Sequence, residues 1–245
     1  MLLEIATSDI ASSLAAEKGG ASRIELCDNL SEGGTTQSYG TIKHCREKLS
    51  IDLFPIIRPR GGDFLYTDDE FHAMRHDIRL CKELGCDGVV IGLLKPEGSI
   101  DTERTAKLVE AAYPMEVTFH RAFDRCRDPF EALEQLISIG CTRILTSGQQ
   151  PTAPAGADLI AELIKKADSR IIIMPGSGVR KENVQELAAK TAATEFHSSL
   201  RTKVDSKMQY RHPAFAASAE SYSHYSVLEH EVRALKQALE ITNAT

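Results

Sequence analysis

The chain has 245 residues, of which 42% are hydrophobic and 26% charged, and its formal net charge is −6. These proportions are ordinary for a globular protein, and a length near 250 residues fits one α/β barrel domain. The chain has no long basic run, which argues against nucleic acid or an anionic membrane as the main partner, and no apolar run approaches the roughly 20 residues needed to span a bilayer.

Short apolar, β-rich runs recur along the chain at the spacing of repeated βα units. Each run is followed by a helical pattern or by a loop that leads to one. Eight runs predict strands, at Leu2–Ile5, Arg23–Cys27, Leu53–Arg58, Gly88–Gly92, Glu116–His120, Arg143–Ser147, Arg170–Met174 and Thr194–Ser198.

Helix start and stop signals fall between these runs. Thr67 and Glu70 predict a capping box, and an apolar stripe at helical spacing follows until Gly85. Asp128 followed by Pro129 predicts an N-cap with proline in the first turn of the next helix. These helix signals are independent of the strand pattern, and they indicate the same alternation of strands and helices along the chain.

The end of the chain follows a different pattern. Residues Leu200–Tyr225 are predicted to be irregular and to fold over a barrel mouth or join a subunit contact. Ser226 and Glu229 then predict the start of the last helix, whose apolar stripe is Leu228, Val232, Leu235 and Leu239.

Alternating strands and helices predict a parallel sheet covered by helices. Eight units favour closure into a (β/α)8 TIM barrel formed by a single domain over residues 1–245, and an open doubly wound sheet is the alternative. No GxGxxG follows the first strand, which removes the usual dinucleotide-binding pattern. Ligands of a parallel barrel bind where the strands end, so we expect the functional residues there.

Strand alternation sorts the charged residues of these runs. Ile24 and Leu26 are apolar and are expected to face the surrounding helices. Because side chains alternate along a strand, Glu25 and Cys27 are then expected to face the barrel lumen. A buried carboxylate needs a partner. The lumen mouth offers several, namely Glu4, Glu25, Arg58, Arg60, His120 and Arg121. The alternative is a structural polar network that seals the barrel interior.

Two arginines end the third strand, in Arg58-Pro59-Arg60, and Gly61 and Gly62 follow them. Proline disfavours helix for the residue before it, and glycine lets backbone approach a ligand closely. Planar guanidinium groups there suit a carboxylate or a phosphate. Alternatively, the arginines pair with the lumen glutamates.

His120 ends the fifth strand and precedes Arg121, which favours a functional role for His120 over that of a core histidine.

The last two strands suggest an anion site. Gly176, Ser177 and Gly178 follow the seventh strand, and His197 and Ser198 lie at the end of the eighth. Loops in these places often bind phosphate in this architecture, since glycines let backbone N–H groups face the anion. Ser147, at the end of the sixth strand, offers a hydroxyl donor to the same rim. Alternatively, these glycines and serines only shape the turns that follow the strands.

The six cysteines are scattered and form no CxxC pair, which does not suggest a structural zinc site. Residues Met1 to Ile5 do not resemble a secretory signal, so we expect free thiols in the cytoplasm. Cys27 is a candidate soft-metal ligand or nucleophile, and Cys126 follows the fifth strand toward the same mouth. The other four suit ordinary buried thiols, namely Cys45, Cys81, Cys86 and Cys141.

Several of these segments resemble the CutC family. The matching strings are RIELC at 23–27, SEGGTT at 31–36, IRPRGGDF at 57–64, VTFHRAFD at 117–124, RILTSG at 143–148, MPGSG at 174–178 and EFH at 195–197. They cover nearly the whole chain in order. The resemblance implies a cytoplasmic, homo-oligomeric TIM barrel with a role in copper homeostasis.

The resemblance also implies a Cu(I) site made by two cysteines, one at the end of each of the first two strands. Cys27 matches the second cysteine, but Ala6 stands where the first is expected. A two-cysteine site therefore does not carry over intact. Cys126, a methionine or a subunit partner would have to supply the second ligand, or this chain does not bind copper there.

Two functional hypotheses follow, and whether the protein is an enzyme stays open between them. One is a copper-homeostasis protein that binds Cu(I) at the barrel mouth through Cys27. The other is an isomerase, lyase or hydrolase for a small anionic or phosphorylated metabolite. Its catalytic residues would be Glu25, Arg58 and His120, and its anion-binding residues Arg60, Ser147, Gly176, Ser177, Gly178, His197 and Ser198. A binding or assembly module without catalysis is a third possibility.

Overall fold

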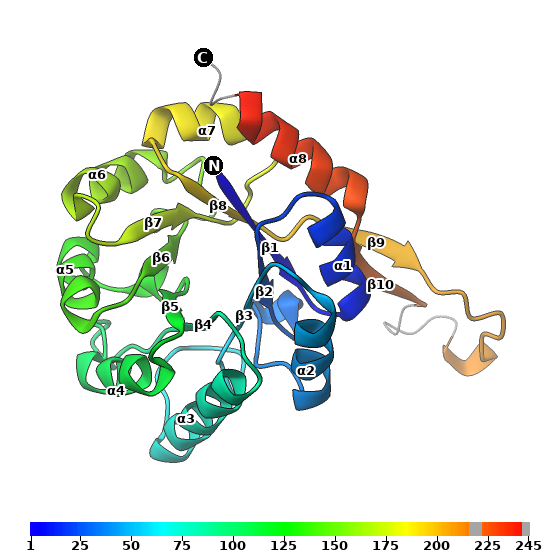
Figure 1. The fold of residues 1–245 in the computed structure, drawn as a ribbon, viewed down its shortest axis with the longest axis horizontal. Helices are drawn as coiled ribbons and strands as arrows, with labels where there is room; N and C mark the ends of the chain where they lie inside the picture. The colour runs from blue at the N-terminus through cyan, green and yellow to red at the C-terminus, as the bar shows by residue number, and fades with distance from the viewer. Residues whose placement is uncertain (216–221, 242–245) are drawn as a thin grey trace.

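The computed structural model describes residues 1–215 and 222–241, and its central strands circle a common axis inside a ring of helices (Figure 1). The barrel strands are β1 (Leu2–Thr7), β2 (Arg23–Leu26), β3 (Asp52–Pro55), β4 (Gly88–Ile91), β5 (Glu116–Phe119), β6 (Arg143–Thr146), β7 (Ile172–Pro175) and β8 (Glu195–Ser198).

A helix follows every barrel strand. These are α1 (Ile10–Lys18), α2 (Tyr39–Lys48), α3 (Asp68–Glu83), α4 (Thr102–Ala112), α5 (Pro129–Ile139), α6 (Ala157–Ala167), α7 (Val184–Thr191) and α8 (Glu229–Ile241). The capping box of Thr67 and Glu70 starts α3, and Asp128 caps α5 with Pro129 in its first turn, as predicted. None of the described helices is long and apolar enough to cross a bilayer.

Backbone hydrogen bonds join the strands into two parallel sheets, in the orders β3-β2-β1-β8 and β4-β5-β6-β7. The two sheets meet along two seams, one between β3 and β4 and one between β7 and β8. At the first seam, a single bridge joins Ile56, just after β3, to Val90 of β4. Within the described residues, no ladder joins β7 to β8. The strand order and helix cover confirm the predicted (β/α)8 barrel, with its hydrogen-bonded ring interrupted at these two seams.

Proline explains where the ring is interrupted. The N–H of Ile56 points to β2 and that of Ile57 to β4, so the nitrogen of Pro55 faces β4 by alternation. In the same way Gly176 donates to Thr146 of β6, so the nitrogen of Pro175 faces β8. Proline has no N–H to donate, and each seam therefore lacks a ladder bond at the strand end.

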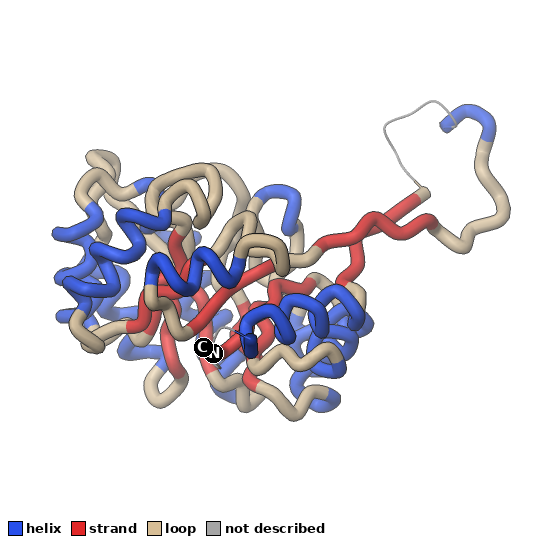
Figure 2. The backbone as a smooth tube through the Cα atoms, turned by 90° about the horizontal axis from the view of Figure 1, so that it is seen from above, coloured by secondary structure: helices blue, strands red, loops and turns tan. Residues whose placement is uncertain are grey.

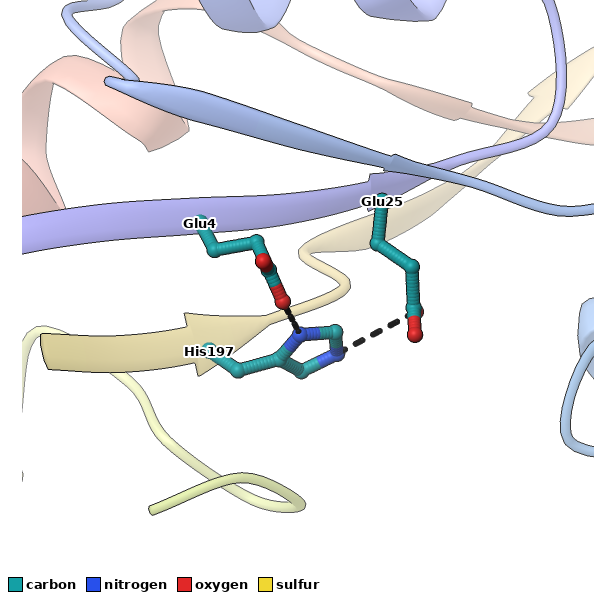
Figure 3. A group of neighbouring side chains, drawn as sticks. All are labelled: Glu4, Glu25 and His197. Carbon is teal, nitrogen blue, oxygen red and sulfur yellow. Dashed lines mark hydrogen bonds and ion pairs between the residues drawn. The ribbon is translucent and has the colours of Figure 1, made fainter. Parts of the chain in front are cut away.

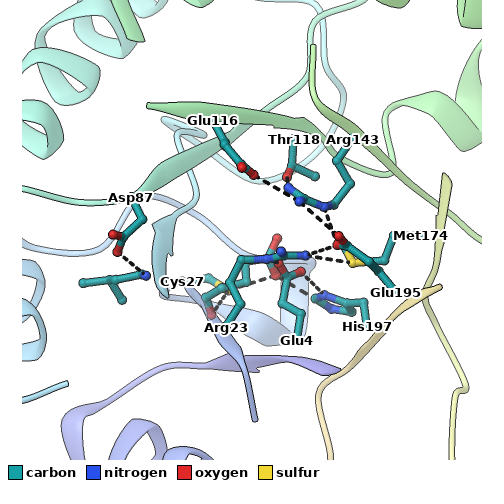
Figure 4. A network of polar contacts seen from close by, with 12 residues as sticks. Glu4, Arg23, Cys27, Asp87, Glu116, Thr118, Arg143, Met174, Glu195 and His197 are labelled. Atoms are coloured by element: carbon teal, nitrogen blue, oxygen red, sulfur yellow. Dashed lines mark hydrogen bonds and ion pairs between the residues drawn. The ribbon is translucent and has the colours of Figure 1, made fainter. Parts of the chain in front are cut away.

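The amino-terminal half of the lumen is filled by ion pairs (Figure 4). Arg23 is only 1% exposed; it pairs with Glu4 and donates to Glu195 at 2.6 Å. Arg143 joins Glu195, at 2.6 Å, to Glu116, at 3.1 Å. Buried charges persist only when they are paired in this way. This part of the barrel matches the structural polar network that is the alternative explanation for the lumen carboxylates.

The segment expected to be irregular, Leu200–Tyr225, forms strands near its two ends, and its residues 216–221 lie outside the described part of the chain. Strands β9 (Arg201–Asp205) and β10 (Ser223–Val227) pair antiparallel and project from the barrel as a narrow arm (Figure 2). Ser226 lies in β10, where its hydroxyl is 3.2 Å from that of Ser12, so it does not cap the last helix. Leu228 of the predicted stripe precedes the helix and is half-buried, whereas Val232, Leu235 and Leu239 are buried on α8 as predicted.

Candidate functional site

A cavity of about 790 Å³ opens where the barrel strands end. Its walls come from the loops after strands on all sides of the ring. Among the residues predicted from the sequence, those that line it are Glu25, Arg58, His120, Ser177, Gly178, His197 and Ser198. The structure therefore gathers most of the predicted residues around one opening.

Three predicted anion-binding residues lie elsewhere. The guanidinium of Arg60 pairs with Glu70 at 2.6 Å and with Asp63 at 3.0 Å, outside the cavity lining. Ser147 is fully buried, and its hydroxyl contacts Asp124 at 2.9 Å. Gly176 lies behind the wall, where a Cβ would meet Leu145. Their polar groups serve local contacts of the loops.

The base of the cavity holds a chain of three ionisable groups (Figure 3). His197 Nδ1 lies 2.7 Å from Glu4 Oε1, and His197 Nε2 lies 3.8 Å from Glu25 Oε2. Burial opposes the charged ring, but Glu25 and Glu4 together raise the pKa of His197. Burial likewise opposes charge on Glu4, yet Arg23 and His197 lower its pKa to about 2. Glu4 is therefore an anion that favours the protonated form of His197.

Glu25 differs from the other lumen carboxylates. Burial raises its pKa and the nearby Glu4 adds to that effect, while His197 opposes it. Its carboxylate lies near His197 and near the Cys27 thiol, whose Sγ is 3.6 Å from Oε2. No lysine or arginine forms an ion pair with Glu25 in the described ranges. The raised pKa favours a role for this carboxyl group in proton transfer.

His120 is a neutral hydrogen-bond donor. Its Nδ1 accepts the backbone N–H of Ala122 at 3.1 Å, so Nε2 carries the proton. Burial, aided by the positive charge of Arg58, lowers the pKa of His120 to about 3. Nε2 is buried and finds no partner within residues 1–215 and 222–241. A buried donor without a partner calls for an explanation, and a ligand bound beside this residue of the cavity lining would provide one.

Arg58 organises the loops that carry the cavity wall. It is 3% exposed, stacks over Phe64 at 5.0 Å, and donates to the carbonyl oxygens of Glu32, Gly34 and Gly62 at 2.7–2.9 Å. These bonds occupy both of its terminal nitrogens. Its electrostatic effect on His120 reaches the site, but its N–H groups mostly hold backbone.

More basic than acidic side chains line the cavity, although the chain as a whole has a net charge of −6. Six basic side chains line it, namely Arg58, Lys95, Arg121, Arg125, Arg180 and Arg201, against the three carboxylates Glu25, Glu32 and Asp63. We did not predict Lys95, Arg125, Arg180 or Arg201. Each follows the end of a strand, which is the signal that could have found them.

The two candidate metal-binding cysteines do not face the cavity. Cys27 is fully buried among Ala6, Phe54, Ile56 and Val90. Burial and the adjacent Glu25 raise its pKa well above the usual range, which keeps the thiol protonated. Cys126 lies beside Gln149, and burial raises its pKa to about 12. Only a thiolate is a good metal ligand, so neither environment favours Cu(I).

A second set of possible ligands is the trio Glu4, Glu25 and His197, whose ligand atoms lie within 4.8 Å of one another. Carboxylate oxygens are hard ligands, whereas Cu(I) prefers thiolates and thioethers. One oxygen of Glu4 also pairs with Arg23. The trio is therefore a better fit to proton transfer than to Cu(I).

Comparison with known proteins places the chain in a family. The model of the CutC family matches residues 1–202. A CutC family protein of Parabacteroides distasonis is 58% identical over 211 residues, which cover 86% of this chain and 87% of the relative. A human protein named copper homeostasis protein cutC homolog is 47% identical over 227 residues, covering 92% of this chain and 83% of the relative.

A solved structure agrees with these relatives. The crystal structure of a putative copper homeostasis protein CutC from Streptococcus agalactiae superposes with a TM-score of 0.78 at 37% identity, covering 81% of this chain and 98% of that one. The chain belongs to the CutC family.

Proposed function

We propose that this protein is an enzyme that binds a small anionic, phosphorylated metabolite at the barrel mouth and moves a proton on it. The observation that carries the proposal is the cavity of about 790 Å³, lined by six basic side chains and three carboxylates. Wall charges that are not neutralised by each other favour a ligand of opposite sign. The volume suits a small molecule.

The anion would bind on the side of the mouth formed after β7 and β8. Ser177 and Gly178 form one part of this wall, and Ser198, Arg180 and Arg201 form the other. Arg180 donates to the Ser198 hydroxyl at 3.1 Å, which holds its guanidinium over the loop. Serine hydroxyls, arginines and a glycine turn together match the donors that phosphate groups use.

Proton transfer would use Glu25 and His120. Glu25 has a raised pKa because it is buried, which suits a general base or acid. His120 presents an unpaired Nε2–H while staying neutral, which suits it to polarise a substrate carbonyl. A glutamate base with a neutral histidine donor is the working pair of a known barrel isomerase. We therefore favour isomerase or lyase chemistry next to a carbonyl over hydrolysis.

Hydrogen–deuterium exchange tests this function whatever product the enzyme forms. The protein is incubated in D₂O with a panel of short aldose and ketose phosphates, and loss of carbon-bound protons is followed by NMR. We expect protein-dependent exchange with at least one compound, lost in Glu25→Gln. Exchange that persists unchanged in Glu25→Gln would remove this residue as the base, and no exchange with any compound would contradict the proposal.

Binding is tested separately by calorimetry with the same panel. Arg180→Gln should weaken binding of a phosphorylated ligand, because Arg180 lines the cavity. Arg170→Gln is the matched control, since this exposed arginine pairs with Glu134 away from the mouth. Equal affinity of the two variants would mean that the anion does not bind beside Arg180.

We also propose a second function, Cu(I) binding by this chain. It is supported by membership of the CutC family and by relatives named for copper homeostasis. The family resemblance assigns the ion to Cys27 at the barrel mouth. A titration against a Cu(I)-selective chelator tests both parts: no copper taken up by the native protein would refute the function, and unchanged affinity in Cys27→Ser would remove Cys27 from the site.

A further inference from the structure

The charged side chains around the mouth cavity are unevenly distributed among the barrel strands. The three carboxylates of the lining, Glu25, Glu32 and Asp63, belong to β2 and to the loops after β2 and β3. Five basic side chains come from the chain that follows β4, β5, β7 and β8, namely Lys95, Arg121, Arg125, Arg180 and Arg201. One side of the mouth is therefore acidic, and the rest of it is basic.

The five basic side chains fall into two groups on different sides of the ring. Arg180 and Arg201 belong to the wall after β7 and β8, where the proposed phosphate binds. Lys95, Arg121 and Arg125 follow β4 and β5, and β4 lies across the ring from β8 (Figure 1). One phosphate on the β7–β8 side does not neutralise the second group. This second group favours another negative charge on the ligand.

Arg121 is the member of the second group that is held in one orientation. Its Nε donates to Asp124 Oδ2 at 2.7 Å, and its Nη2 donates to Ser147 Oγ at 2.8 Å. Asp124 is itself fixed, because it accepts the hydroxyl of Thr146 at 2.5 Å and the backbone N–H of Ser147 at 3.0 Å. These contacts order the guanidinium before a ligand arrives, which lowers the entropy cost of binding.

The other edge of the Arg121 guanidinium is unused. Arginine has five N–H groups, and Nη1 of Arg121 forms no hydrogen bond within the described residues. The side chain of Arg121 is 41% exposed, whereas Asp124 and Ser147, which hold its inner edge, are buried there. The exposed edge therefore carries the N–H groups of Nη1 and the second N–H of Nη2. Two parallel N–H groups match the two oxygens of a carboxylate.

We propose that the ligand of the mouth cavity is a phosphorylated carboxylic acid, whose carboxylate binds Arg121 while its phosphate binds beside Arg180. The inference rests on the proposed function, narrows its substrate class and assigns Arg121 as the residue that selects this class. Arg58 is not available for the carboxylate, because its terminal nitrogens donate to backbone carbonyls. Arg60 pairs with Glu70 outside the lining.

The acidic side of the mouth suits the uncharged part of such a ligand. Glu25 and Glu32 line this side and would repel a second anionic group placed there. Ionised carboxylates accept hydrogen bonds from hydroxyl groups. A hydroxylated carbon chain that joins the phosphate to the carboxylate therefore fits the distribution of charge around the cavity.

Calorimetry with matched pairs of probes tests this inference on the full chain. One pair is 3-phosphoglycerate and glycerol 3-phosphate, and the other is 6-phosphogluconate and glucitol 6-phosphate. The members of each pair differ at one end, which is a carboxylate in the first and an alcohol in the second. We expect the native protein to bind the acid of at least one pair about 10- to 100-fold more tightly, as charge-assisted hydrogen bonds allow.

Three variants assign this preference to its residue. Arg121→Gln should bring the affinity for the acid down to that for the alcohol phosphate, whereas a merely structural defect would weaken both. Arg180→Gln should weaken both members of a pair alike. Arg127→Gln is the matched control and should keep the preference, because Arg127 lies in the same loop as Arg121 but outside the cavity lining, 3.9 Å from Glu131. Thermal melts check that every variant folds.

The outcomes separate this inference from the proposed function. Equal affinity for acid and alcohol phosphates, or a preference for the acid that persists in Arg121→Gln, would overturn the inference and leave the phosphate site standing. Tighter binding of glucitol 1,6-bisphosphate than of 6-phosphogluconate would also overturn it, because the second anionic group would then be a phosphate. No binding of any probe would contradict both the inference and the proposed function.

Discussion

The pKa of His197 should depend on Glu4, and Glu4→Gln tests this directly. Glu4 is fully buried, and although burial opposes its charge, Arg23 and His197 lower its pKa from 4.5 to about 2. At about 1.4 kcal/mol per pH unit, this difference corresponds to about 3 kcal/mol of stability at pH 7. That agrees with the roughly 3–5 kcal/mol that breaking a buried ion pair costs.

The sign of the pH dependence follows from the lowered pKa. The stabilisation by Glu4 is complete above its ordinary pKa of 4.5 and is lost as pH falls toward 2. Urea unfolding should therefore show Glu4→Gln about 3 kcal/mol less stable than native at pH 7, and about 1.5 kcal/mol less stable at pH 3. NMR should also show a lower pKa for His197. A gap that is small at pH 7, or constant with pH, would refute this reasoning.

Three further predictions concern the cavity wall. NMR should show a neutral His120 ring down to about pH 4, since the pKa of His120 is about 3. The stability that the neutral ring contributes is lost as pH falls below 6.5, the ordinary pKa of histidine. A titration midpoint near 6.5 in the folded protein would contradict this prediction. Arg58→Met should raise the pKa of His120, because it removes a nearby positive charge. It should also lower the unfolding free energy by more than about 2 kcal/mol, because three backbone carbonyls lose their donor. Unchanged stability would show that these hydrogen bonds are dispensable. Gly92→Ala should displace the His120 ring, because the new Cβ would lie 2.2 Å from its Cε1, and should cost about 1–3 kcal/mol in a melt; unshifted ring resonances would contradict this.

The barrel can be predicted because its local signals agree with one another. Thr67 and Asp128 cap helices as their sequence contexts indicate, and each apolar run forms a strand in the expected order. The arm could not be predicted, because alternation in Arg201–Asp205 and Ser223–Val227 is weak without a core to pack against. The predicted homo-oligomeric state and cytoplasmic location stay predictions.

The position of the candidate site can be predicted better than the roles of its residues. Alternation correctly sends Glu25 and Arg58 toward the lumen mouth, and both line the cavity. It could not show that Arg58 uses its donors on backbone carbonyls, or that Arg60 pairs with Glu70 instead of facing the mouth. Side-chain partners depend on loop conformation, which periodicity does not specify.

The distribution of charge along the lumen is the strongest argument for a ligand. A lumen network that served only stability would pair its charges along its whole depth, because an unpaired buried charge is costly. Pairing is complete around Arg23 and Arg143 at the amino-terminal end. Toward the mouth, the described residues give Glu25 no ion pair with an arginine or lysine, only His197 at 3.8 Å and the Cys27 thiol at 3.6 Å, and they give the Nε2 of His120 no partner. Both groups belong to residues that line the cavity, where a ligand would bind.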